Sequence, residues 1–216
     1  MWSDTTMHVQ SSTRTPAVLD WLEVLSGIGL VLFIMGHSLF VASVIFGAST
    51  FNGMAGFFEN TGLAQVGGPI IGLVFLLHFV LAARKIPFRA AQQSVIWKHA
   101  RMMHHEDTWL WLIQAVTGML ILLMGSIHMW VLLNDLPITA EKSVALLYAG
   151  TWLWFYLFFL LFVAMHVAIG VYRAGVKWGY IRRENRARMK KYLYIFAGVL
   201  VAIDLVSLIR FYFLSV

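Results

Sequence analysis

The feature that most constrains this chain is a set of four histidines inside four separate long apolar segments. They are His37, His78, His128 and His166. An ionisable side chain is costly inside hydrocarbon, so a histidine in such a segment is a functional-site hypothesis by default. Four of them in matched positions indicate a site that is built across helices.

The composition excludes an ordinary soluble protein. Of the 216 residues, 60% are hydrophobic and 12% are charged, whereas a soluble domain is about 45–50% apolar. We therefore expect an all-α integral membrane protein that forms one domain over residues 1–216, with a polar cytoplasmic tail over residues 1–19. The net charge of +6 does not indicate nucleic acid, because the basic residues cluster between the apolar segments, as membrane topology requires.

A spanning helix needs about 20 mostly apolar residues. Five segments meet this requirement and predict five transmembrane helices in one bundle: 20–46, 68–83, 108–133, 144–172 and 192–214.

The connections between these segments differ sharply in charge. Five Lys or Arg residues follow the second segment and eight follow the fourth, whereas loop 47–67 has none and loop 134–143 has only Lys142. Since cytoplasmic loops are enriched in Lys and Arg, the N-terminus is predicted to be cytoplasmic and the C-terminus outside.

The four histidines fall at two depths. His37 and His128 precede the ends of their segments by about nine and five residues, and His78 and His166 by about six. Because successive segments run in opposite directions, the first two lie toward the outer surface and the other two toward the inner one. At 1.5 Å per residue the two levels are roughly 10–15 Å apart in a hydrocarbon layer of ~30 Å.

Two histidines at each level favour axial ligation of two haems stacked along the membrane normal. Two imidazoles fill both axial positions of a haem iron, which indicates electron transfer rather than oxygen chemistry. The chain has no cysteine, so it lacks thiolate haem ligands, iron–sulfur ligands and covalent haem attachment, and the haems must be of the b type. Zinc would want about four ligands at one point. Histidines that only bond within the bundle are the remaining alternative.

Several other residues have an open interpretation. Gly118 and Gly125 share a helical face with His128, and Gly29 and Gly36 recur near His37. These glycines would admit a flat macrocycle or would serve ordinary small-residue helix packing. The sequence assigns no role to three further groups: the buried-charge candidates Asp204 and Arg210, the polar-stretch residues His99, His104 and His105, and His8 in the tail.

The resemblance to a known family rests on four stretches: DWLEVLSGIGLVLFIMGHSLFV, RKIPF, EDTWLWLIQAVTGMLILLMGSIHMW and GVYRAGVKWG. Across nearly its whole length the chain resembles the cytochrome b subunit of the succinate dehydrogenase/fumarate reductase family, of the single-chain, five-helix, dihaem type that uses menaquinone. The resemblance implies that residues 1–216 form one dihaem cytochrome b membrane domain.

The resemblance also implies residue roles. A distal haem would be held by His37 and His128, and a proximal haem by His78 and His166, in agreement with the depths derived above. Glu59 falls at the family's quinol-site glutamate, and a carboxylate there could accept a quinol proton.

Two further positions, Trp111 and Lys177, match family residues that contact haem propionates. The implied cofactors are two haem b groups and menaquinone on this chain, with FAD and iron–sulfur clusters on partner subunits.

The implied function is that of a membrane anchor and electron-transfer subunit of a quinol:fumarate reductase in the bacterial cytoplasmic (inner) membrane. It would pass electrons from menaquinol to an iron–sulfur subunit and a flavoprotein. Three alternatives stay open: succinate oxidation with menaquinone reduction, an anchor with purely structural haems, and an unrelated dihaem carrier such as a hydrogenase or formate dehydrogenase subunit. The sequence leaves open whether such three-subunit complexes dimerise.

The chain departs from the family pattern at four positions. Some dihaem members have a proton-relaying glutamate where this chain has Ala164, and an arginine near the distal propionates where it has Leu146. A glutamine and a serine of the first helix are Glu23 and Val24 here. These departures put the proton coupling in doubt more than the haems.

Overall fold

The computed structural model describes residues 15–87 and 89–215, and these residues form helices joined by short connections without any strand. Five helices in this part of the chain are long and apolar enough to cross a membrane. They are α1 Thr15–Ala42, which continues through the 3₁₀ turn η1 Ser43–Phe46, then α3 Leu63–Ala83, α5 Glu106–Leu133, α7 Trp152–Lys177 and α8 Arg186–Tyr212. The predicted all-α membrane fold with five spans is confirmed.

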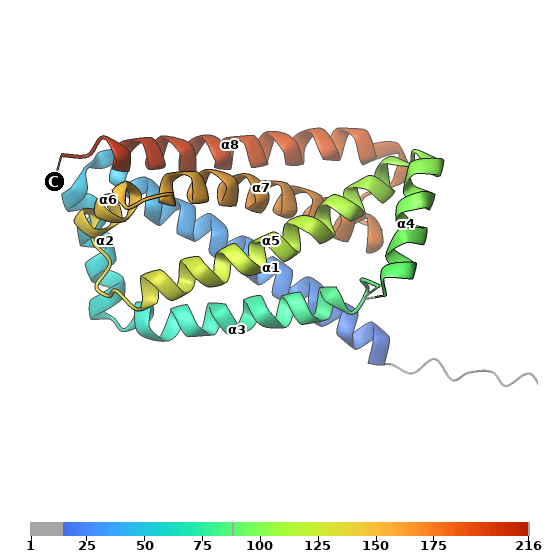
Figure 1. Cartoon of the computed structure of the whole chain (residues 1–216), viewed down its shortest axis with the longest axis horizontal. Helices are drawn as coiled ribbons and strands as arrows, with labels where there is room; N and C mark the ends of the chain where they lie inside the picture. Colours follow the sequence, from blue (N-terminus) through green and yellow to red (C-terminus); the bar gives the residue numbers. More distant parts are fainter. Residues whose placement is uncertain (1–14, 88, 216) are drawn as a thin grey trace, which may run out of the picture.

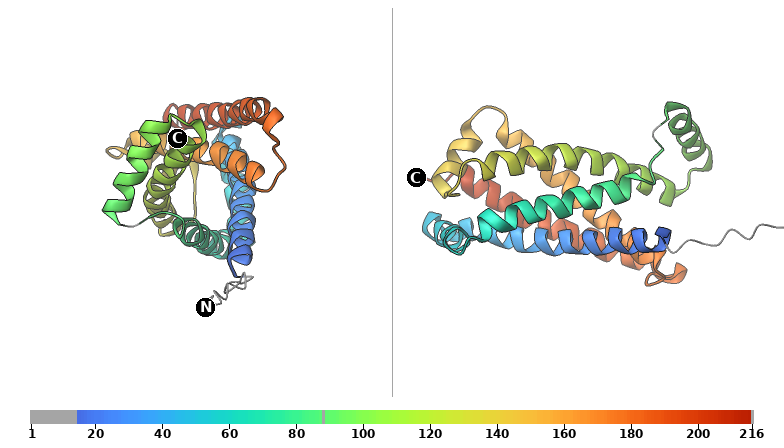
Figure 2. Two further views of the ribbon diagram at one scale, coloured as in Figure 1. Left: turned by 90° about the vertical axis from the view of Figure 1, so that its right-hand side faces the viewer. Right: turned by 90° about the horizontal axis from the view of Figure 1, so that it is seen from below.

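The five long helices run along a common direction, with α1 and α5 inclined to the others (Figure 1). The two orthogonal views in Figure 2 show that they form one bundle. Helices α2 and α6 and the C-terminus lie at one end, which we call the α2/α6 end. Helix α4 and the start of α1 lie at the other end, which we call the α4 end. Helix α1 lies mainly against α3, and α5 mainly against α7.

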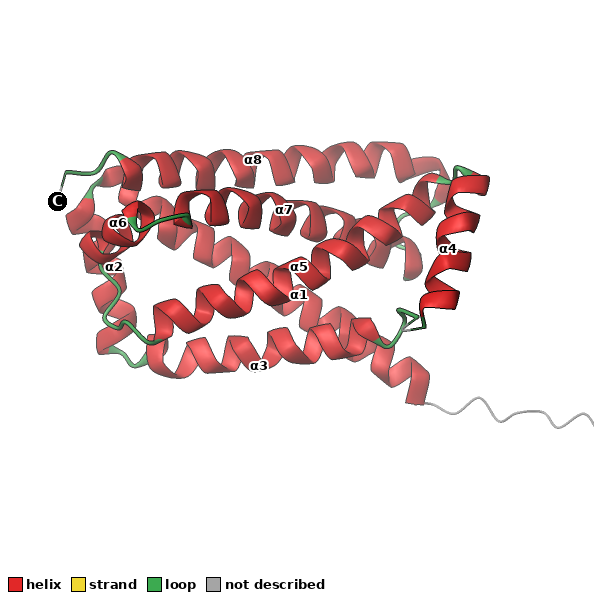
Figure 3. Cartoon of the chain, in the orientation of Figure 1, coloured by secondary structure: helices red, strands yellow, loops and turns green. Residues whose placement is uncertain are grey.

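Three short helices occupy stretches that were expected to be loops or part of a span (Figure 3). Helix α2 covers Ala48–Asn60, α4 covers Ala90–Met103 and α6 covers Ala140–Tyr148. The start of α6 is capped by the Thr139 side chain, which accepts a hydrogen bond from the Lys142 backbone N–H. Helix α4 lies across the end of the bundle (Figure 1).

Four predicted span starts differ from the structure by five or more residues. Helix α3 begins at Leu63 rather than at residue 68, and α8 begins at Arg186 rather than at residue 192. The fourth span begins at Trp152 rather than at residue 144, because Gly150 adopts a left-handed φ of 73° that separates α6 from α7. The first helix begins at Thr15, inside the stretch expected to be a polar tail. Pro16 lies in its first turn, where no backbone hydrogen bond is lost. His8 lies outside the described residues.

Buried apolar side chains gather at the two ends of the bundle. At the α2/α6 end they come from η1, α2, α6, α8 and the residues just after α8: Val44, Phe51, Ala55, Ala140, Val144, Leu147, Phe211 and Leu214. At the α4 end a smaller cluster contains Leu110, Ile169, Tyr172 and Ile181. The four intramembrane histidines lie between these clusters, so packing at both ends positions the helices that carry them.

Candidate functional site

The histidines nearer the α2/α6 end come together from two helices. The rings of His37 on α1 and His128 on α5 have centroids 6.0 Å apart and planes inclined by 75°. Phe33 stacks on the His37 ring at 5.5 Å, one turn earlier on the same helix. We call His37 and His128 the outer histidines. The structure thus brings together the first pair that the sequence predicted.

The surroundings of the outer histidines are mostly aromatic. On α7, Phe159 lies 5.8 Å from the His128 ring, and the Tyr156 hydroxyl lies 3.3 Å from its Nδ1 atom. No polar contact of the His37 ring occurs among the described residues. Ring packing therefore places this pair, with Tyr156 as the polar partner of one member.

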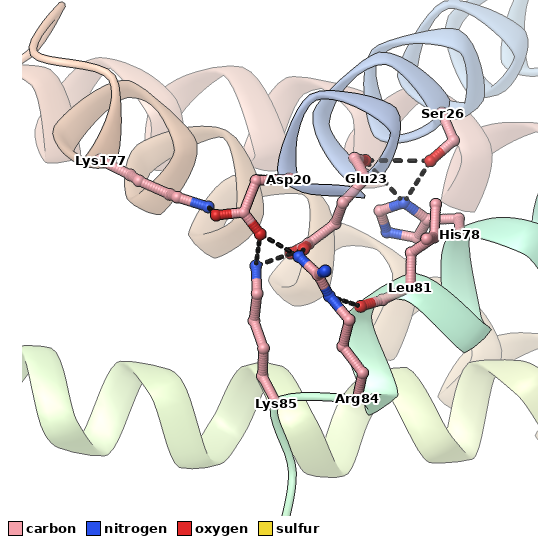
Figure 4. A network of polar contacts seen from close by, with 8 residues as sticks. All are labelled: Asp20, Glu23, Ser26, His78, Leu81, Arg84, Lys85 and Lys177. Atoms are coloured by element: carbon pink, nitrogen blue, oxygen red, sulfur yellow. Dashed lines mark hydrogen bonds and ion pairs between the residues drawn. The ribbon is translucent and has the colours of Figure 1, made fainter. Parts of the chain in front are cut away.

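The histidines nearer the α4 end, which we call the inner histidines, are placed by hydrogen bonds. On α3, His78 Nδ1 lies 3.1 Å from the Glu23 carbonyl oxygen and 3.1 Å from Ser26 Oγ (Figure 4). A carbonyl oxygen can only accept, so the Nδ1 atom carries the proton. The lone pair of the neutral ring is then on Nε2, the nitrogen that remains available to a ligand.

His166 on α7 repeats this arrangement against α5. Its Nδ1 atom lies 3.1 Å from the Gln114 carbonyl oxygen and 3.2 Å from Thr117 Oγ1. The Gln114 side-chain amide also lies 3.2 Å from His166 Nε2. An amide N–H there donates to the Nε2 lone pair, which agrees with the same tautomer.

Glycines let both inner rings approach the neighbouring helix. A Cβ atom added to Gly27 would lie 3.0 Å from His78 Cε1, and one added to Gly118 would lie 3.0 Å from His166 Cε1. Gly118 therefore makes room for an inner histidine, although the sequence grouped it with His128.

The other candidate glycines behave differently. A Cβ at Gly125 would meet Phe75 at 3.2 Å, as in ordinary helix packing, and Gly29 and Gly36 have nothing within 4 Å. Of the glycines singled out from the sequence, Gly118 alone thus approaches a histidine.

Sequence reasoning missed Ser26, Gly27 and Thr117 as neighbours of the inner histidines. A signal was present, because a hydroxyl residue directly precedes a glycine in both EVLSG and QAVTG, and each glycine precedes an outer histidine by ten residues.

The donor set fits a group that takes two axial nitrogens. No three His, Cys, Asp or Glu side chains gather as they would around one ion in residues 15–87 and 89–215. An ion bound by imidazole nitrogen at about 2.0–2.1 Å would leave two facing ring centroids roughly 6 Å apart. The 6.0 Å separation of His37 and His128 matches this value. Haem ligation itself stays a prediction.

An ionic network closes the α4 end beside His78 (Figure 4). Asp20 of α1 pairs with Lys177 at 2.5 Å, with Lys85 at 3.1 Å and with Arg84. Glu23 of the same helix also pairs with Lys85 and with Arg84. The network joins the ends of α3 and α7 to the α1 turn whose carbonyl holds His78.

Lys85 lies two residues beyond the end of α3. Burial opposes its charged form, but hydrogen bonds to Glu23 and Asp20 outweigh burial and raise the pKa of Lys85. Lys177, predicted to meet a propionate, has Asp20 as its partner and lies 5.6 Å from the Trp178 ring centroid. Trp111, the other predicted propionate contact, is half-buried on α5.

Helix α8 contributes a carboxylate near the outer histidines. The buried Ser38 hydroxyl, next to His37 in the chain, donates to Asp204 Oδ2 at 3.0 Å. This contact joins Asp204 of α8 to α1.

Glu59 lies near the end of α2, at the same end of the bundle as the outer histidines. Its Oε1 atom accepts a hydrogen bond from Gln65 Nε2 at 2.5 Å. The preceding residue, Phe58, packs against Phe40 at 5.4 Å, and Phe40 lies 6.4 Å from the His37 ring. Two aromatic rings thus connect the Glu59 region with an outer histidine.

Comparison with known proteins identifies the relatives of this chain. The model of the succinate dehydrogenase/fumarate reductase transmembrane subunit family matches residues 90–206. The fumarate reductase cytochrome b subunit of Wolinella succinogenes is 31% identical over 211 residues, which cover 92% of this chain and 82% of the relative. The subunit of the same name from Helicobacter pylori strain 26695 is 33% identical over 184 residues, covering 81% of this chain and 72% of the relative.

Proposed function

The chain belongs to the succinate dehydrogenase/fumarate reductase transmembrane subunit family, and on this premise we propose that it carries electrons from menaquinol to a fumarate-reducing partner. As a member of this family it is a multi-pass membrane subunit of an enzyme complex. The finer proposal is that it holds two b haems in the bacterial cytoplasmic membrane, with the α4 end toward the cytoplasm.

The single observation that carries the proposal is the set of four histidines at two levels between the packed ends. His37 and His128 would hold the haem nearer the α2/α6 end, and His78 and His166 the one nearer the α4 end. A bound haem would supply one-electron transfer, because the two oxidation states of its iron differ by one electron, and two histidine ligands would leave no open site for oxygen. At His166, iron ligation would replace the bond that Gln114 makes to Nε2.

Glu59 is the proposed first acceptor of quinol protons. Oxidation of menaquinol to menaquinone releases two electrons and two protons, and reduction of fumarate to succinate consumes the same number of each. A carboxylate near the outer surface would take a proton as an electron leaves the quinol. The Phe58–Phe40 contact supports this role, because it places the carboxylate region beside the His37 helix.

The α4 end is the side from which electrons would pass to the partner subunits. Lys177 would exchange its Asp20 partner for a haem propionate, with Trp111 as a second contact. An iron–sulfur subunit and a flavoprotein that bears FAD would dock on this end. Ala164, on α7, has no ionisable group, so a transmembrane proton route in this chain would use another residue.

The direct test is to purify the complex with its partners and to measure menaquinol:fumarate and succinate:menaquinone turnover. We expect a flavoprotein and an iron–sulfur subunit to copurify, and the fumarate-reducing rate to exceed the reverse rate. Faster succinate oxidation would assign the opposite direction. In His37→Ala, quinol-linked turnover should be lost while assembly persists; full turnover would instead indicate an anchor with structural haems.

Glu59→Gln tests the proton acceptor. It should slow quinol oxidation by about a hundredfold or more, the lower end of the range attributed to a general base, without loss of haem. Glu141→Gln is the matched control, because Glu141 is an exposed carboxylate at the same end that bonds to Asn52. Equal rates in the two variants would remove Glu59 from the mechanism.

A further inference from the structure

Helices α1 and α5 share one sequence pattern. Residues 23–27 read EVLSG and residues 114–118 read QAVTG, and each glycine is followed ten residues later by an outer histidine, His37 or His128. Ten residues correspond to roughly 15 Å of helix. Each of these two helices therefore presents a hydroxyl–glycine step at one level and an imidazole at the other.

The two hydroxyl–glycine steps meet the inner histidines in the same way. The carbonyl oxygen three residues before the hydroxyl lies 3.1 Å from the imidazole Nδ1 in both cases. The hydroxyl oxygens of Ser26 and Thr117 lie at 3.1 and 3.2 Å from the same atoms. Both hydroxyls donate to a carbonyl of their own helix, so they accept from the ring.

We propose that Ser26–Gly27 and Thr117–Gly118 are two equivalent imidazole cradles, and that their hydroxyls are positioning residues for the inner histidines. Each cradle holds the ring by Nδ1, with the glycine admitting the ring edge, and leaves the Nε2 lone pair for a ligand, which at His166 would displace the Gln114 amide. α1 and α5 thus serve both levels, as cradles at the inner one and as ligand donors at the outer one. The inference rests on the proposed function, because it takes His78 and His166 as haem ligands.

The cradle has a chemical consequence for the bound group. A hydrogen bond from the second ring nitrogen fixes the tautomer and orientation of a metal-binding histidine and makes it a stronger donor. A stronger donor stabilises oxidised iron, so removal of one acceptor should raise the reduction potential of that haem. The carbonyl remains in hydroxyl variants, which should therefore retain haem.

The decisive experiment is redox titration and electron paramagnetic resonance of the purified complex with Ser26→Ala and with Thr117→Ala. Each variant should raise the midpoint potential of one haem, by a roughly threefold shift in its reduction equilibrium, about 28 mV at 59 mV per tenfold. Both variants should change the midpoint potential and the low-spin signal of the same haem, since His78 and His166 are expected to share one iron. The other haem should keep its potential.

Matched variants distinguish hydroxyls that position the inner histidines from a hydroxyl that only bonds within its own helix. Ser207→Ala removes a fully buried hydroxyl that donates to its own helix, at Ile203 O, and contacts no histidine among the described residues. It should leave both potentials unchanged. The conservative variants Ser26→Thr and Thr117→Ser keep the hydroxyl and should behave as the unaltered chain, even if an alanine variant fails to assemble.

The outcomes distinguish this inference from the proposed function. An unaltered complex without two b haems would refute the proposed function. Two haems whose potentials and resonance signals stay unchanged in both alanine variants would overturn the cradles alone. The proposal of two cradles would also be overturned if Ser26→Ala and Thr117→Ala changed the midpoint potentials of different haems.

Discussion

The outer and inner histidines are held by different kinds of contact. His37 and His128 lie among rings, with Phe33 stacked on one and Phe159 beside the other. His78 and His166 are each bound through Nδ1 to a backbone carbonyl and a hydroxyl. The outer level is therefore placed by side-chain packing and the inner level by the backbone of the neighbouring helix.

This difference predicts how each level responds to substitution. A carbonyl acceptor is present whatever the side chain, so the orientation of the inner rings should survive most changes except those that fill the glycine position. Ring packing has no such backbone support. Since the Tyr156 hydroxyl is the polar partner found for His128, we expect the outer level to respond to changes in neighbouring aromatic residues. The following predictions test this contrast, from the largest effect to the smallest.

Replacement of single histidines should have the largest effect. His78→Ala should remove the inner haem and keep the outer one, and His128→Ala should do the reverse, because an iron that loses one axial imidazole is poorly retained. Haem per chain, measured as the pyridine haemochrome, should fall from two to one in each variant.

His99→Ala is the control for histidine replacement, since His99 lies on α4 beyond the spans. Its haem content should equal that of the unaltered chain. If His78→Ala kept both haems, the inner level would need other ligands.

Filling a cradle should have the next largest effect. In Gly27→Ala the new Cβ would lie 3.0 Å from His78 Cε1, so the ring must move and the inner haem should be held less tightly. Gly29→Ala adds the same atom where nothing lies within 4 Å. It should leave the haem unaffected and gain about 0.5–1 kcal/mol of helix stability.

Haem loss during dilution, followed by optical spectroscopy, measures both glycine variants. Equal rates of haem loss in Gly27→Ala and Gly29→Ala would show that the close approach of the His78 ring to Gly27 does not affect haem retention.

Tyr156→Phe should give the smallest effect. It deletes a hydroxyl 3.3 Å from His128 Nδ1, a weak contact at the upper end of hydrogen-bond distances. We expect a potential shift of the outer haem that is smaller than the inner shift in Ser26→Ala, and retention of both haems. A shift of the inner haem in Tyr156→Phe would mean that the two levels are not independently held.

Hydropathy alone predicted five spans, because a segment that must satisfy its backbone inside lipid has to be a long apolar helix. It failed at the start of the fourth span, where the apolar run from Val144 continues across the break at Gly150. Residues 48–60, which form α2, were expected to be part of a loop, and their glycines and asparagines are indeed residue types typical of turns. At the α2/α6 end, α2 contacts α6, for example through the hydrogen bond that the Ala140 N–H donates to Asn52 Oδ1.

The candidate site was predictable to the extent that its chemistry lies in side chains. Histidines in apolar segments are visible in any sequence, and their depths follow from helix rise. The acceptors of the inner rings were not predictable in the same way, because they are the carbonyls of Glu23 and Gln114, which every residue type possesses. The network that gives Lys177 a carboxylate partner depends on the meeting of three helices.

The account depends most on paired imidazoles at two levels, and the most direct test is the number and type of haems in the purified complex. Pyridine haemochrome analysis together with low-temperature electron paramagnetic resonance should show two b haems per chain, both with low-spin signals of bis-imidazole iron. A single haem, a high-spin signal from an iron with one protein ligand, or no haem at all would contradict it.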